Sequence, residues 1–176
     1  MRIFTAIPLP RQTKDSISEM LRGRLPIPYI NTTDLHITLN FFGELSDAQV
    51  EKVKNDFSRF TSDQNGFQIE FDSIKKINHQ LHLAVKPSKE LMELQTKMEK
   101  EYVSVGFTFQ DRAFYPHVKL GNLHMDNVMN RQRKMENFPN QELSKVNFRA
   151  VEIALYESKL LLHHPKHILL LESHLA

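Results

Sequence analysis

The chain has 176 residues, 40% of them hydrophobic, and a formal net charge of +2. This length and composition favour one domain with its own core, spanning residues 1–176, and the small charge argues against the dense basic surface of a dedicated nucleic-acid-binding protein. The chain contains no cysteine, which excludes a disulfide framework, a thiolate metal site and a cysteine nucleophile.

The opening residues, Met1–Pro10, are apolar over too short a run for a secretory signal, and Pro8 and Pro10 interrupt them. No stretch of the sequence approaches the ~20 apolar residues that a membrane-spanning helix needs. We therefore expect a cytoplasmic protein with no membrane partner.

Hydrophobic periodicity predicts alternating strands and helices in the first half of the chain. In chain order these are a strand at Arg2–Ile7, a helix from about Arg11 to Arg24, a strand within Leu35–Leu45, a helix from Asp47 to about Phe60, and a hairpin of Phe67–Ile77 and Gln80–Val85 that turns near Asn78 and His79. Ser46 and Asp47 are suitable N-cap residues for the second of these helices.

The second half repeats much of this order. It contains a helix capped by Ser88 and running to about Tyr102, a short strand at Phe107–Phe109, a strand within Ala113–Gly121, a helix at Asp126–Glu136, and strands at Val146–Glu157 and Ile168–Glu172 with a turn at His163–His167 between them. The repetition predicts an α+β fold with two pseudo-symmetric lobes, each an antiparallel sheet backed by helices, and an active-site cleft between the lobes. We expect the lobes to exchange strands, so the midpoint near residue 85 is not a domain boundary.

Two of the predicted strands carry the same polar pattern. His36 and Thr38 alternate with Leu35, Ile37 and Leu39, and further along the chain His117 and Lys119 alternate with apolar residues in the same way. Alternate side chains of a strand share a face. Each strand would therefore expose a polar face and bury an apolar one. If the two strands lie side by side, two imidazoles meet, which is the arrangement that acid–base catalysis on a phosphate ester requires.

The other histidines give no comparable pattern. His79 and His82, and the group His163, His164 and His167, have spacings that suggest metal ligands, but no well-placed carboxylate completes a site. We expect these to be solvated turn residues, and we expect no metal and no cofactor.

Four segments resemble the two-histidine phosphoesterase superfamily, whose mark is a pair of His-x-Thr/Ser-x motifs. The resemblance is narrower to the RNA 2′,3′-cyclic phosphodiesterases, also called 2′-5′ RNA ligase-like proteins. The matching segments are Arg2–Pro10, Asp34–Leu45, Arg112–Leu120 and Glu152–Leu160.

The resemblance implies a mechanism in which RNA 2′,3′-cyclic phosphate ends or cyclic nucleotides are the substrates. By this analogy His36 donates a proton to the leaving 3′ oxygen, His117 accepts a proton from the attacking water, and the product is a 2′-phosphate. Thr38 would donate a hydrogen bond to the phosphate, and Arg112 would be a further substrate contact. Histidines with an ordinary pKa near ~6.5 would allow both protonation states near neutral pH.

Lys119 departs from the family pattern, which has Thr or Ser at that position. We expect its ammonium group to bind the phosphate and to disfavour protonation of His117, which would help a base. Alternatives remain open: the lysine weakens the chemistry, so that the protein is a non-catalytic RNA-end or nucleotide-binding module, or the protein is a metal-dependent hydrolase. The reverse, ligating reaction is possible within the same chemistry, and we expect a monomer.

Overall fold

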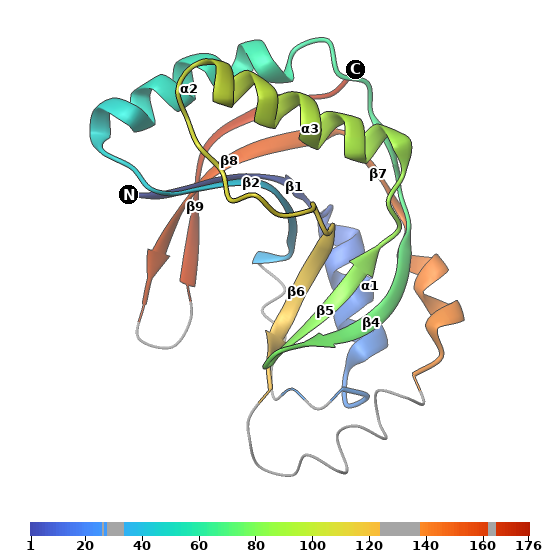
Figure 1. Cartoon of the computed structure of the whole chain (residues 1–176). Helices are drawn as coiled ribbons and strands as arrows, with labels where there is room; N and C mark the ends of the chain where they lie inside the picture. Colours follow the sequence, from blue (N-terminus) through green and yellow to red (C-terminus); the bar gives the residue numbers. More distant parts are fainter. Residues whose placement is uncertain (26, 28–33, 124–137, 162–164) are drawn as a thin grey trace.

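A computed structural model describes residues 1–25, 27, 34–123, 138–161 and 165–176. Its main feature is a seven-stranded sheet in which all neighbouring strands are antiparallel (Figure 1). In spatial order the strands are β4 (Phe71–Ile77), β5 (Gln80–Val85), β6 (His117–Asn122), β2 (His36–Glu44), β1 (Arg2–Pro8), β8 (Glu152–Leu160) and β9 (Pro165–His174). The α+β fold predicted from the sequence is confirmed.

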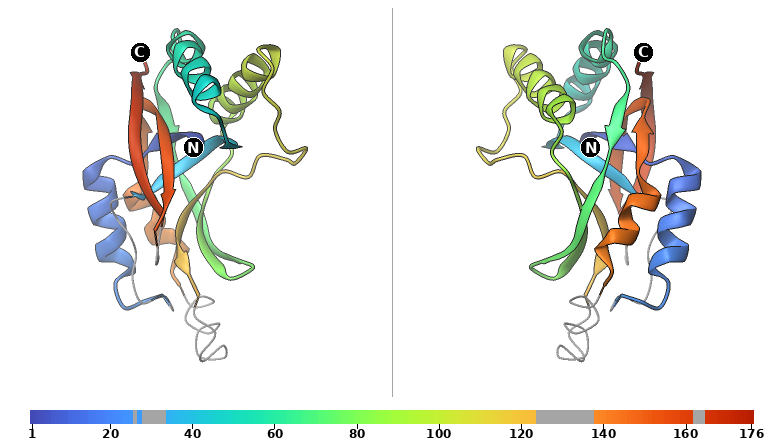
Figure 2. Two further views of the ribbon diagram at one scale, coloured as in Figure 1. Left: turned by 90° about the vertical axis from the view of Figure 1, so that its left-hand side faces the viewer. Right: turned by 90° about the vertical axis from the view of Figure 1, so that its right-hand side faces the viewer.

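The helices divide the molecule into two lobes. Helices α2 (Asp47–Thr61) and α3 (Lys89–Ser104) lie side by side and contact β2, β8 and β9, whereas α1 (Arg11–Leu21) and the 3₁₀ helix η2 (Asn140–Val146) contact one another beside the other half of the sheet, where η2 also contacts β4 (Figure 2). The first strands of the chain therefore share a lobe with its last strands, as expected from exchanged elements. No helix in the described part of the chain is long and apolar enough to span a membrane.

The two halves of the sheet meet at β2 and β6. Ile37 and Val118 form the pair that joins these strands, and both side chains are fully buried. The remaining pairs of the sheet join strands over several residues each. The strands that carry the two histidines are therefore neighbours, but a single residue pair joins them.

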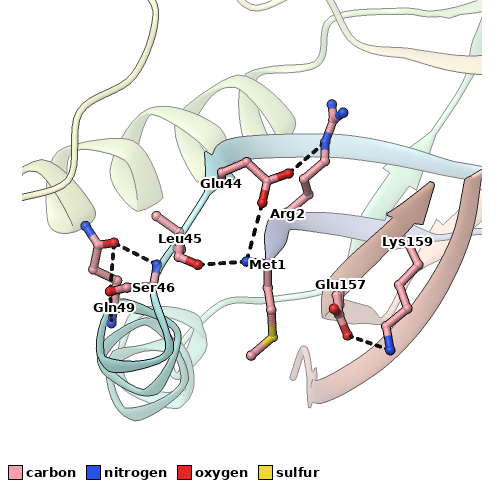
Figure 3. A network of polar contacts seen from close by, with 8 residues as sticks. All are labelled: Met1, Arg2, Glu44, Leu45, Ser46, Gln49, Glu157 and Lys159. Atoms are coloured by element: carbon pink, nitrogen blue, oxygen red, sulfur yellow. Dashed lines mark hydrogen bonds and ion pairs between the residues drawn. The ribbon is translucent and has the colours of Figure 1, made fainter.

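Helix α2 begins where the sequence predicts. The Ser46 side chain accepts a hydrogen bond from the Gln49 backbone while the Gln49 side chain accepts one from the Ser46 backbone, a reciprocal capping box. Just before this cap, the amino group of Met1 donates to the Leu45 carbonyl at 2.7 Å and lies 3.4 Å from the Glu44 carboxylate (Figure 3). These contacts hold the start of β1 against the end of β2, the strand that carries His36.

Three strand predictions need correction. The segment Phe67–Ile77 is two strands, β3 (Phe67–Ile69) and β4, and Val146–Glu157 is likewise divided into β7 (Phe148–Ala150) and β8, because β3 and β7 pair with each other outside the main sheet. Gly66 permits this pairing, since a Cβ there would lie 2.8 Å from the Ala150 carbonyl oxygen.

Phe107–Phe109 is not a strand. The alternation in this segment arises because the rings of Phe107 and Phe109 both pack on Phe42, with centroids 5.3 and 5.2 Å away, so burial occurs without strand pairing. Helix α1 ends at Leu21, three residues earlier than expected, and Gly23 follows with a positive φ of 69°. The predicted helix Asp126–Glu136 lies outside the described residues, as do His163 and His164 of the predicted turn.

Candidate functional site

His36 is the first residue of β2 and lies in an aromatic surrounding. Its Nδ1 is 2.5 Å from the Asp34 carbonyl oxygen, and because a carbonyl only accepts, Nδ1 carries the proton. The ring lies 5.0 Å from Phe4 and 6.2 Å from Tyr156, and it meets the ring of His167 edge to face at 5.1 Å. This packing leaves Nε2 as the nitrogen available for chemistry.

His117 is the first residue of β6 and repeats this local geometry. Its Nδ1 donates to the carbonyl oxygen of Tyr115, again two residues earlier, at 2.8 Å. The imidazole stacks on His82, with centroids 4.1 Å apart and planes 13° apart, and on Tyr115 at 5.1 Å. The two histidines therefore have the same tautomer, with Nδ1 bound to backbone and Nε2 left for other partners.

The strand register brings the two polar pairs to one face. Because Ile37 and Val118 are opposite one another and buried, the antiparallel register sets His36 across from Lys119 and Thr38 across from His117. The electrostatic influence of His117 on His36 is consistent with this closeness. Two histidines that are far apart in the sequence thus share one surface.

Burial is the main reason why the pKa of His36 is lowered, to about 4. The hydrogen bond to the Asp34 carbonyl opposes this shift, and His167, Lys14 and His117 lower the pKa further. Local sequence pattern predicts an ordinary histidine pKa, because it does not reveal that the ring is packed among other rings.

Burial also lowers the pKa of His117, against the opposing effect of its hydrogen bond to Tyr115. Arg112 and Lys119 lower it further, as expected for a lysine beside a base. Both shifts favour the neutral imidazole in the unliganded protein, whereas the sequence suggested histidines with an ordinary pKa.

The remaining residues predicted for the site lie around these rings. Thr38 is half-buried in β2, and Lys119 is exposed in β6 with a pKa that desolvation lowers. Arg112 is exposed in the loop before β6, where its charge acts on His117. The sequence did not point to Lys14 of α1, whose charge acts on His36.

Sequence reasoning also missed two histidines. His82 lies in β5 with only 6% of its surface exposed, and His167 lies half-buried in β9 against His36, so the expectation that they are solvated turn residues is wrong. His79 is exposed in the hairpin turn, as expected. One signal could have identified His82: it is the polar residue within the run Leu81–Val85, the same criterion that singled out His36.

Histidine, aspartate and glutamate side chains are also the usual protein ligands of metal ions. Within residues 1–25, 27, 34–123, 138–161 and 165–176, no group of three or more His, Asp or Glu side chains is arranged to hold a metal ion. The four histidines at the site instead form two ring pairs, His36 with His167 and His82 with His117.

Known proteins of one family are similar to this chain. A family model described as the 2′-5′ RNA ligase superfamily matches residues 10–160. A protein of Bacillus subtilis (strain 168) named RNA 2′,3′-cyclic phosphodiesterase is 26% identical over 126 residues, which cover 66% of this chain and 68% of that protein. A protein of the same name from Methanocaldococcus jannaschii is 24% identical over 171 residues, or 91% of this chain and 92% of that protein.

Solved structures share the fold over nearly the whole chain. A crystal structure of a phosphoesterase is similar with a TM-score of 0.81 at 22% identity, covering 99% of this chain and 97% of that one. E. coli LigT in complex with 3′-AMP is similar with a TM-score of 0.79 at 20% identity, with the same coverage. The two-lobed arrangement is thus the fold of LigT-like phosphoesterases.

Proposed function

The chain belongs to the 2′-5′ RNA ligase superfamily of two-histidine phosphoesterases, and we propose that it is an RNA 2′,3′-cyclic phosphodiesterase that leaves a 2′-phosphate. The shared name of the relatives supports the reaction class. The single observation that carries the mechanism is the matched pair of imidazoles, each with Nδ1 bound to the carbonyl two residues earlier. Such bonds fix the tautomer and the ring plane, so that Nε2 of each ring faces the substrate.

The two histidines have opposite roles in the proposed step. His117 Nε2 accepts a proton from a water molecule, the water oxygen bonds to phosphorus, and the bond from phosphorus to the 3′ oxygen breaks. Protonated His36 donates its Nε2 proton to that oxygen, which leaves as the 3′ hydroxyl. Each turnover consumes one water, and the same groups would form a 2′-5′ linkage if a 5′ hydroxyl took the place of the water.

Three residues stabilise the charge on the phosphate in this proposal. Thr38 donates a hydrogen bond to a non-bridging oxygen from the strand position across from His117. Lys119, across from His36, and Arg112 attract the anion, and both lower the pKa of His117 so that this base stays neutral. Lys119 therefore supports rather than replaces the histidine chemistry.

Pure protein is expected to hydrolyse 2′,3′-cyclic AMP in the presence of EDTA and to release adenosine 2′-phosphate. The two imidazoles supply both proton transfers, so chelation leaves the rate unchanged. Chromatography of the products measures the rate and identifies the isomer. Binding without turnover would support the non-catalytic module instead, and loss of activity with EDTA, restored by a divalent metal, would support a metal-dependent hydrolase.

Substrate binding is expected to take up a proton at His36. The pKa of this ring is about 4 in the unliganded protein, so near neutral pH it must gain a proton before it acts as an acid. A bound phosphate anion favours the charged imidazole and raises its pKa. Calorimetry of 2′,3′-cyclic AMP binding to the His117→Gln variant, in buffers of different ionisation enthalpy, should show uptake that approaches one proton.

This ligand and this variant remove two other groups that could take up a proton. The cyclic phosphate has no second ionisation near neutral pH, and His117 is absent. The double variant His36→Gln/His117→Gln is the matched control and should bind with no proton uptake. Equal uptake in both variants would show that His36 is not the acid.

A further inference from the structure

His82 covers a face of the proposed general base. Its ring lies 4.1 Å from that of His117 at an interplanar angle of 13°, the closest ring pair among the described residues. Strand β5 positions it there, since Leu83 pairs with Val118 and His82 with Lys119 in the β5–β6 register. The side chain is only 6% exposed. Its strand neighbours Leu81 and Leu83 belong to the hydrophobic core, whereas the imidazole of His82 stacks on the proposed base.

The two ring nitrogens of His82 differ in their hydrogen bonding. Nε2 lies 3.0 Å from the Gln80 side-chain oxygen and donates to it, which fixes the plane of the ring. Nδ1 is buried and has no hydrogen-bond partner within the part of the chain that the structure describes. An imidazole in this state is neutral, because protonating Nδ1 would place a charge in a buried position beside other cations.

Titratable and charged groups surround the stacked rings of His82 and His117. His82 faces His117 and Lys119 of β6, and burial, followed by the charges of these two residues, lowers its pKa to about 4. His117 is also influenced by Arg112 from the preceding loop, and Tyr115 lies beside both rings. His36 of β2 is influenced by His117, and Asp72 of β4 acts on Tyr115, so these groups also belong to the surroundings of the pair. Burial and these charges favour the neutral form of His82.

We propose that His82 is a positioning residue for the general base: its neutral ring excludes water from one face of His117, holds that imidazole in its working plane and keeps it unprotonated. This inference rests on the proposed role of His117. The ring itself, rather than its titration, is what His117 needs from residue 82.

The test compares the His117 pKa, measured by NMR titration of its ring protons, in the unliganded wild-type protein, His82→Ala and His82→Phe. Removing the ring should raise the pKa of His117 by roughly one pH unit, because water then solvates the imidazolium. Phenylalanine restores the covering ring without a titrating nitrogen, and should restore the wild-type value. An unchanged pKa in the alanine variant, or a raised value in the phenylalanine variant, would overturn the proposal.

Two additions make the result independent of folding and of turnover. The branched variant His82→Val suits a strand and replaces His82→Ala if the latter is unstable, with the same expected shift. In the wild-type protein, ring protons of His117 should show a nuclear Overhauser effect to those of His82, and its absence would contradict the stacking. Since none of these measurements uses substrate, they can fail while the protein hydrolyses cyclic phosphates, and they can succeed in a protein that does not.

Activity then links the stack to catalysis. The limb of the kcat/KM profile that His117 sets should move to higher pH in His82→Ala and return to its wild-type position in His82→Phe. A merely structural role would lower the rate of both variants equally at every pH and leave the limb in place.

Discussion

Replacement of either His36 or His117 by glutamine is expected to lower kcat for 2′,3′-cyclic AMP by roughly 10²- to 10⁴-fold. Glutamine removes proton transfer while it keeps a hydrogen-bonding side chain among the rings that surround each position. Because the two imidazoles act on one displacement, the double variant should be little slower than the slower single variant. Initial rates at saturating substrate give kcat for all three variants.

His79→Gln is the matched control for these variants. His79 lies exposed in the turn between β4 and β5, on the same hairpin that carries His82. It takes part in none of the ring contacts described above. Its replacement should leave kcat within about twofold of wild type, as for most exposed positions. Near-wild-type turnover by His117→Gln, with the product still a 2′-phosphate, would contradict the assigned base.

Lys119→Thr, which restores the residue type of the family motif, is expected to lower kcat/KM by about tenfold, or about 1.4 kcal/mol. The threonine removes a cation from the strand position across from His36 and beside His117. Two effects combine: weaker attraction of the phosphate, and a higher pKa of His117. The limb of the kcat/KM profile that His117 sets should accordingly move to higher pH, and KM should become less sensitive to salt.

Lys119→Met separates the charge from the chain length. Methionine keeps an unbranched side chain without the ammonium group, so it should reproduce the pH and salt effects of the threonine variant. Lys119→Arg keeps the charge and should retain the wild-type position of the limb that His117 sets. A substantial gain in rate for Lys119→Thr would show that the lysine impairs this site.

The sequence was sufficient for the features that depend on local pattern. Alternation predicted the strands of His36 and His117, and the N-caps Ser46 and Ser88 predicted two helix starts, because strand faces and helix caps are decided by neighbouring residues. It could not show that β3 leaves the main sheet for β7, since that pairing depends on the close approach of Gly66 to Ala150.

The residues that pack against the two imidazoles could not be predicted from local sequence pattern for the same reason. His82 and His167 come from β5 and β9, and only the order of strands in the sheet brings them onto His117 and His36. The lowered pKa of His36 follows from that packing, so the sequence alone suggested an ordinary value. Residues that touch across strands determine the electrostatics here, and they are not adjacent in the chain.

A crystal structure of this protein with adenosine 2′-phosphate tests the central claim most directly. We expect one phosphate group with oxygens about 3 Å from Nε2 of both His36 and His117. The Nδ1 atoms should keep their bonds to the Asp34 and Tyr115 carbonyls. A phosphate that touches only one of these rings, or that binds instead in the cavity of about 700 Å³ beside Lys86 and Arg149, would contradict the account.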